Sequence, residues 1–131
     1  MNIDTEKCKE EFCKLLRSTG REGVEDVIAD LEEQGFFKAP ASAGHHLNVE
    51  GGLALHSLNT GKAALMVWEG MKQLDPSVER EVKRDHVIIA SLLHDVCKTD
   101  IYKRAMRRQR NPATGVYEDV EGWKVSYRKF P

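Results

Sequence analysis

The adjacent pair His94 and Asp95 ends the most apolar segment of the chain, HVIIASLLHD. An ionised carboxylate in such surroundings is costly to bury unless a cation or strong hydrogen-bond donors compensate its charge. Imidazole nitrogen and carboxylate oxygen together suit manganese, iron, nickel or zinc. The pair therefore predicts a divalent metal site or, alternatively, a polar helix end at which Lys98 balances Asp95.

A second histidine, His56, lies in another apolar segment, GGLALHSL, 38 residues before His94. A single histidine among apolar residues is more often a core residue with satisfied ring nitrogens than a ligand. Two such histidines and an aspartate favour a shared site, because together they supply three ligands for one ion. We therefore predict that His56, His94 and Asp95 bind a metal ion.

Three helices are predicted ahead of this pair. Apolar residues recur every three or four positions over residues 4–18 and 23–34, which is typical of amphipathic helices. Residues 52–73 are apolar over a wider arc, so we expect a helix that is buried on more than one side and carries His56.

A fourth helix is predicted to begin near Ser77 and to lead to His94. Its first half is charged, whereas residues 87–93 leave no polar face. Because a helix that is apolar all round must be covered all round, we expect it to enter the centre of the protein.

The chain changes character after Tyr102. The turn signal NPATG at residues 111–115 separates a basic segment from VYEDVEGWKVSYRKF, which alternates and is rich in valine and aromatic residues. This pattern predicts a mainly α fold with a small C-terminal β-hairpin or three-stranded ribbon.

Residues 36–52, FFKAPASAGHHLNVEGG, lack periodicity and have the composition of a loop. Loops of this kind often carry functional residues. Gly51 and Gly52 lack side chains, so they permit the close approach of another helix or of a phosphate to the following helix; a simple loop-to-helix bend is the alternative.

The two segments GGLALHS and SLLHDVCK together resemble the first histidine and the His-Asp doublet of the HD superfamily of metal-dependent phosphohydrolases. The resemblance spans roughly residues 36–102. The longer pattern HHLNVEGGLALHSL is similar to phage-associated HD hydrolases and to the HD domain of 3'-5' exoribonucleases. It implies an HD-type helical bundle.

The resemblance also implies roles for individual residues. His56, His94 and Asp95 would hold one or two divalent ions (Mn, Fe, Ni, Zn or Mg) that activate water for attack on a phosphomonoester or phosphodiester. Asp95 and Lys98 would be catalytic, with Lys98 contacting the phosphate; a solvated helix-end cation is the alternative for Lys98. His46 would line the substrate pocket or supply an extra ligand; capping of backbone groups in its loop is the alternative.

The sequence departs from the family pattern in its last metal ligand, an aspartate that should lie on a helix well beyond the doublet. Asp100 is too close to Asp95 along the chain, and Asp119 falls in a predicted strand. Three explanations stay open: an HD domain truncated at its C-terminus, a ligand supplied by a partner subunit, or an inactive site.

A basic cluster follows the predicted site and could gather the phosphates of a nucleotide or a short nucleic acid, with Arg104 as the residue we expect to bind substrate. An ordinary solvated surface is the alternative. A non-catalytic nucleotide- or RNA-binding module is therefore a second hypothesis for the function. The cluster consists of Lys103, Arg104, Arg107, Arg108 and Arg110.

Composition excludes several classes of protein. The formal net charge of -1 argues against a general affinity for nucleic acid or anionic membranes, and no apolar stretch approaches the 18 residues that a bilayer-spanning helix needs. Three unpaired cysteines argue against a disulfide framework. We expect a single cytoplasmic domain over residues 1–131, with no membrane contact.

Overall fold

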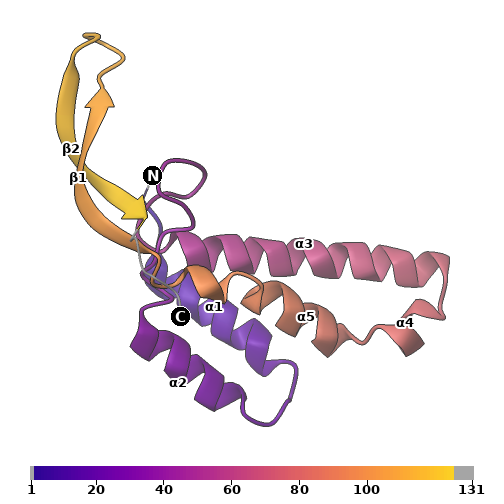
Figure 1. Ribbon diagram of the computed structural model, residues 1–131. Coiled ribbons are helices and arrows are strands. Elements are labelled where there is room, and N and C mark those ends of the chain that lie inside the picture. The colour runs from indigo at the N-terminus through magenta and orange to yellow at the C-terminus, as the bar shows by residue number, and fades with distance from the viewer. Residues whose placement is uncertain (1, 126–131) are drawn as a thin grey trace.

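The computed structural model describes residues 2–125, apart from the side chain of Arg107, and comprises a helical body from which a β-hairpin projects (Figure 1). The predicted mainly α fold with a C-terminal hairpin is confirmed, whereas residues 126–130 of the predicted ribbon lie outside the described residues. The elements are α1 (Thr5–Arg17), α2 (Val24–Gln34), α3 (Gly52–Leu74), α4 (Val78–Glu81), α5 (Arg84–Leu93), a 3₁₀ helix (Val96–Lys98), β1 (Tyr102–Arg110) and β2 (Tyr117–Val125).

Three phenylalanines form the centre of the core beneath α1. The ring of Phe12, on α1, lies 5.2 Å from that of Phe36 and 5.4 Å from that of Phe37, centroid to centroid. Phe36 and Phe37 follow α2, so the segment predicted as a loop contributes its first two residues to the core. This packing holds the loop against the helical body.

The three cysteines differ in burial. Cys8 and Cys13 are buried in the core, Cys97 is exposed, and all three are free thiols. Burial, with a smaller contribution from the charge of Glu11, raises the pKa of the Cys8 thiol to about 11. Cys8 therefore stays protonated and packs as a small apolar residue.

Helices α3 and α5 lie against each other, and Gly61 permits their close approach. A Cβ atom at Gly61 would lie 2.9 Å from Cδ2 of Leu92 and 3.4 Å from Oγ of Ser91. Since a side chain at this position would push α5 outward, the missing side chain brings the segment before His94 close to α3.

The fourth predicted helix is interrupted rather than continuous. Its charged first half forms only the short α4, and the chain is extended at Val82 and Lys83 before α5 begins. The indole Nε1 of Trp68 donates a 2.8 Å hydrogen bond to the carbonyl oxygen of Val82. The carbonyl freed by the break thus has a partner on α3.

The expectation that α5 is covered all round is wrong. Ile88 and Leu92 are fully buried, but Ala90 is exposed and Val87 and Ile89 are only partly buried. One face of α5 packs on the core and the opposite face is solvent-accessible in the structure. Apolar composition predicted which residues can be buried, not which ones are covered.

The glycine pair before α3 permits two close approaches, that of the preceding loop at Gly52 and that of helix α1 at Gly51. A Cβ atom at Gly52 would lie 2.1 Å from the carbonyl oxygen of Leu47, and one at Gly51 would lie 2.7 Å from Cγ2 of Thr5. The backbone N–H groups of Gly52 and Leu53 donate to the carbonyl oxygens of Val49 and Ala39. These donors are therefore used within the protein and not left for a phosphate.

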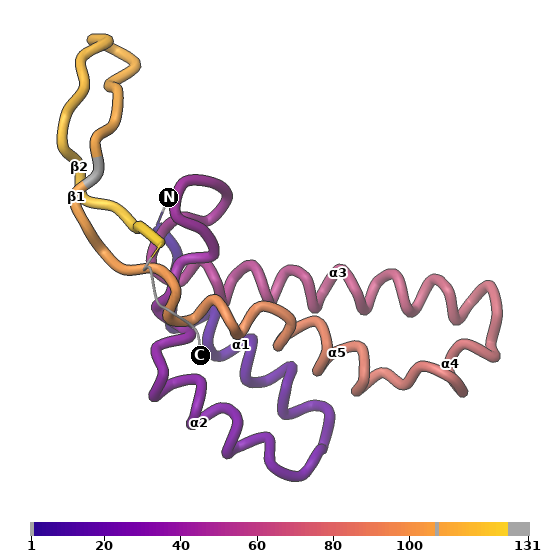
Figure 2. Tube along the Cα trace, viewed as in Figure 1, coloured from indigo at the N-terminus to yellow at the C-terminus, as the bar shows by residue number. Residues whose placement is uncertain are grey.

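The hairpin rises from the end of the helical body at which α3 begins, opposite to α4 (Figures 1 and 2). Strands β1 and β2 pair antiparallel over their whole length, from Tyr102 opposite Val125 to Arg110 opposite Tyr117. Its turn follows the predicted signal: Asn111 accepts a hydrogen bond from Gly115, which has a φ of 72°. Glycine adopts this left-handed conformation readily.

Within residues 2–125, no helix is both long enough and apolar enough to cross a lipid bilayer.

Candidate functional site

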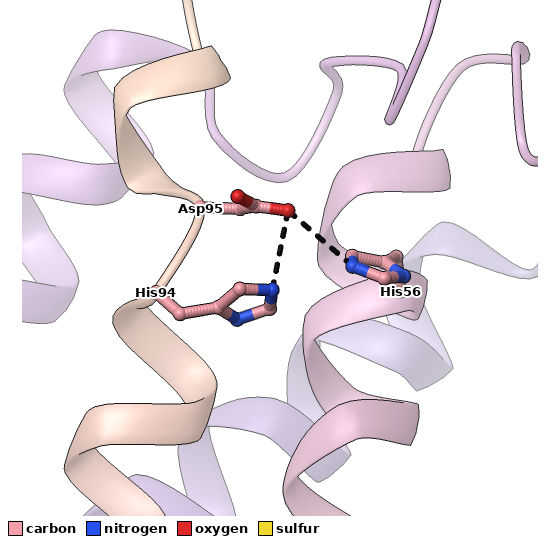
Figure 3. A group of neighbouring side chains, drawn as sticks. All are labelled: His56, His94 and Asp95. Atoms are coloured by element: carbon pink, nitrogen blue, oxygen red, sulfur yellow. Dashed lines mark ion pairs between the residues drawn. The ribbon is translucent and has the colours of Figure 1, made fainter.

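Two neighbouring segments position the predicted metal ligands. His56 lies on the second turn of α3, His94 directly follows the last residue of α5, and Asp95 precedes the short 3₁₀ helix (Figure 3). Asp95 has φ -115° and ψ 17°, so the chain leaves the α-helix there and the carboxylate turns back toward α3.

His56, His94 and Asp95 form a triad in which both histidines approach one carboxylate oxygen of Asp95. Oδ2 of Asp95 lies 3.3 Å from Nε2 of His56 and 3.2 Å from Nε2 of His94. Each residue offers one ligand atom, and these atoms all lie within 4.8 Å of one another. Residues separated by 38 positions in the sequence are therefore close enough for simultaneous coordination of one ion.

A backbone hydrogen bond orients the ring of His94. Its Nδ1 lies 2.6 Å from the carbonyl oxygen of Ser91. A carbonyl only accepts, so Nδ1 carries the hydrogen and, in the neutral ring, Nε2 presents its lone pair to Asp95. Two acceptors 3.2 Å apart repel each other unless a proton or a cation lies between them. The donor set thus fits a divalent ion, and Ser91 would orient the ligating ring.

Asp95 is the least exposed member of the group. Its side chain is 18% exposed, against 34% for His56 and 35% for His94. Nζ of Lys98 lies 3.4 Å from Oδ2 of Asp95, one turn further along the chain. Lys98 therefore partly balances the carboxylate, as the alternative interpretation of the sequence expects, and is also within reach of a group bound at the triad.

Not every residue selected from the sequence joins this cluster. His46 is exposed in the loop before α3, and its carbonyl oxygen accepts a 2.9 Å hydrogen bond from the Ser42 hydroxyl. Among residues 2–125, the converging group holds three His, Cys, Asp or Glu side chains and gains no fourth from Asp100 or Asp119. The role of His46 in binding substrate stays a prediction.

Arg104 lies on β1 and has its own partners. Its Nε donates a 2.8 Å hydrogen bond to Oε1 of Glu121, and its guanidinium carbon lies 5.4 Å from the centre of the Trp123 ring. The hydrogen bond to Glu121, and then the charge of that carboxylate, raise the pKa of Arg104. Arg104 therefore belongs to the hairpin base and not to the triad.

The sequence did not predict two features of this region. One is the Ser91 carbonyl, although its signal was present: at the end of a helix, a histidine ring can reach the carbonyl three residues earlier. The other is a cavity of about 460 Å³ at the hairpin base, lined by Asn2, Ile3, Thr5, Asn48, Val49, Glu50, Arg104, Glu121, Gly122 and Trp123. Its lining depends on strand register and loop path, which no local pattern shows.

The sequence of the chain is similar to that of one protein of known activity. No family model and no solved structure matches the chain. Over 94 residues it is 35% identical to the dihydroneopterin 2',3'-cyclic phosphate phosphodiesterase of Methanocaldococcus jannaschii. The match covers 72% of this chain but 34% of that protein, so the chain spans about one third of the relative's length. The similarity thus links most of the chain to part of a phosphodiesterase.

Proposed function

We propose that this chain carries the metal-binding core of a phosphodiesterase that hydrolyses small phosphate esters. The observation that carries the proposal is the convergence of His56 and His94 on Oδ2 of Asp95, within 3.3 Å. The similarity to a phosphodiesterase supports the reaction class. A 2',3'-cyclic phosphate on an organic heterocycle is the substrate class that the relative's name suggests.

Each residue of the triad would have a separate role in the reaction. A divalent ion bound there would supply Lewis acidity, which polarises the phosphate and activates water. The Ser91 carbonyl keeps the lone pair of His94 directed at the site, and Asp95 would orient the attacking water. Nζ of Lys98 lies 3.4 Å from the oxygen of Asp95 that both histidines approach. Lys98 would therefore offset negative charge on the phosphate oxygens.

Hydrolysis of the cyclic phosphate requires only water as the second reactant. The water oxygen forms a bond to phosphorus, one P–O ester bond of the cyclic phosphate breaks, and the departing alcohol oxygen takes up a proton. The product is a phosphomonoester with a free neighbouring hydroxyl group. Neither an oxidant nor a second substrate is needed.

The non-catalytic hypothesis gains no support from the basic cluster. Glu121 neutralises Arg104, and Asp119 lies opposite Arg108 in the hairpin register. Acidic residues on β2 thus offset part of the charge on β1, which weakens the case for a surface that collects nucleic acid through charge alone.

Metal uptake tests the proposal most directly. Metal-free protein is titrated with Mn²⁺, Fe²⁺, Ni²⁺ or Zn²⁺ by calorimetry, and metal content is measured by elemental analysis. Wild type is expected to bind at least one of these ions, and His94→Ala and Asp95→Asn are expected to weaken binding at least tenfold. His86→Ala is the matched control, because His86 is an exposed histidine on the first turn of α5.

Hydrolysis of a nucleoside 2',3'-cyclic phosphate is followed by ³¹P NMR on the metal-loaded protein. Lys98→Ala is expected to lower the rate while metal uptake is retained. The proposal fails if wild type takes up no ion, or if His94→Ala binds metal as well as His86→Ala does.

A further inference from the structure

The cavity at the hairpin base has the size and lining of a small-ligand site. Its volume of about 460 Å³ lies within the range of pockets that hold a nucleoside-sized molecule. It combines one indole ring, Trp123, with the amide of Asn48 and the carboxylate of Glu50. An aromatic face together with a few polar groups is typical of pockets that orient a planar ligand.

The charge of the cavity indicates which part of a substrate it suits. Two carboxylates line it, those of Glu50 and Glu121, against one cation, Arg104. Arg104 is already paired with Glu121 at 2.8 Å. A phosphate group would therefore meet an excess of negative charge, whereas a group with N–H donors would find an acceptor in Glu50.

Glu50 is placed to act as that acceptor. It is exposed at the edge of the cavity, and its charge is near enough to Arg104 to contribute to that residue's raised pKa, after the larger effects of Glu121. A carboxylate accepts two parallel hydrogen bonds from an amino group and an adjacent ring N–H. Trp123 lines the same cavity, so a ring bound to Glu50 would lie near its indole.

Two residues that line the cavity flank, in sequence, the segments that carry the triad. Glu50 precedes Gly51, the N-cap of α3, and from Gly52 to His56 the helix rises by roughly 6 Å. On the other side, Arg104 follows Lys98 by six residues. Both segments that carry the triad therefore lead, within a few residues along the chain, to residues that line this cavity.

We propose that the cavity recognises the heterocycle of the substrate, and that Glu50 selects rings in which an amino group adjoins a ring N–H. The proposal rests on the proposed function for the identity of the ligand as a substrate. Binding of a heterocycle in the cavity can be tested without metal and without phosphate. A negative result there would leave the proposed phosphodiesterase activity untouched, and the reverse also holds.

The test uses metal-free protein and compares guanosine with inosine, which differ only in the amino group. Binding is followed by NMR through the two tryptophan indole N–H signals. Guanosine is expected to shift the signal of Trp123 and not that of Trp68, which is buried beside Val82 at the other end of α3. Inosine is expected to bind about tenfold more weakly, because it lacks one hydrogen bond to a charged acceptor.

Two variants complete the experiment. Glu50→Gln is expected to lower guanosine affinity about tenfold, since a neutral amide accepts only one of the two hydrogen bonds. Glu79→Gln, an exposed carboxylate on α4, is the matched control and is expected to bind like wild type. Equal affinities for guanosine and inosine, an unshifted Trp123 signal, or full affinity in Glu50→Gln would each overturn the assignment.

Discussion

The two halves of α3 are both apolar, but their surroundings differ. In residues 52–61, six side chains or glycines are buried, and this half carries His56. In residues 62–74, Trp68 is the buried residue, while Met66 is 76% exposed and Leu74 is 90% exposed. Sequence alone suggested a helix buried on more than one side throughout; the structure confirms this for the first half and contradicts it for the second.

The difference shows what positions the candidate site. The first half is enclosed by α1, α5 and the loop before α3, and this enclosed half carries His56 of the triad. A metal site needs ligands that are held before the ion arrives. The rigidity of His56 therefore comes from packing around residues 52–61, and the apolar residues of the second half contribute little to it.

The strongest test of this enclosure is Gly52→Ala. The new Cβ atom would lie 2.1 Å from the carbonyl oxygen of Leu47, a backbone atom that also accepts a hydrogen bond from Ala41. The loop must move and that hydrogen bond must weaken, so we expect a loss of about 3 kcal/mol in the free energy of unfolding. Urea unfolding followed by circular dichroism measures it, and a loss below about 1 kcal/mol would contradict the close packing.

Two leucines compare the halves directly. Leu58 is 1% exposed and Leu74 is 90% exposed. Leu58→Ala is expected to destabilise the protein by about 3 kcal/mol, because it removes buried methyl groups and leaves a cavity. Leu74→Ala is expected to change stability by less than about 0.5 kcal/mol in the same urea experiment. Similar losses for both variants would show that the second half is also covered in solution.

Metal binding should stabilise the enclosed half. An ion that binds the folded triad and not the unfolded chain raises the free energy of unfolding by about 2.7 kcal/mol when its free concentration is 100 times the Kd. Thermal unfolding of wild type, with and without the ion that binds best, is expected to show this increase in the free energy of unfolding. His94→Ala should show none of it, and His86→Ala should show all of it. An equal gain in all three proteins would indicate ion binding elsewhere.

Sequence patterns predicted the local features of this molecule well. Periodicity located α1, α2 and α3, and the glycine-containing turn located the hairpin. The occurrence of His56, His94 and Asp95 in apolar segments indicated residues that do converge. Each of these depends on neighbours in sequence or on a strong preference for burial.

The features that were not predicted depend on contacts between distant segments. The break at Val82 is accompanied by a hydrogen bond from Trp68, and the neutralisation of Arg104 depends on the register that brings it to Glu121. The exposure of Ala90 depends on which elements cover α5. Apolar periodicity gives the faces that can be buried but contains no information about their partners.

Two glycines on α3 offer the most discriminating comparison, because opposite effects on stability are expected at the two positions. A Cβ atom at Gly70 would meet nothing within 4 Å, whereas one at Gly61 would lie 2.9 Å from Cδ2 of the fully buried Leu92. Alanine favours a helix over glycine by about 1 kcal/mol. Gly70→Ala should therefore stabilise the protein by about that amount in urea unfolding.

In Gly61→Ala the same preference is opposed by the displacement of Leu92, so we expect a net loss of about 1 kcal/mol. Opposite signs at positions nine residues apart would mark the place where the enclosure of α3 ends. If both variants were stabilised, α5 could move away from α3 at little cost, and the short distances between His56 and Asp95 would then need an ion, and not packing, to maintain them.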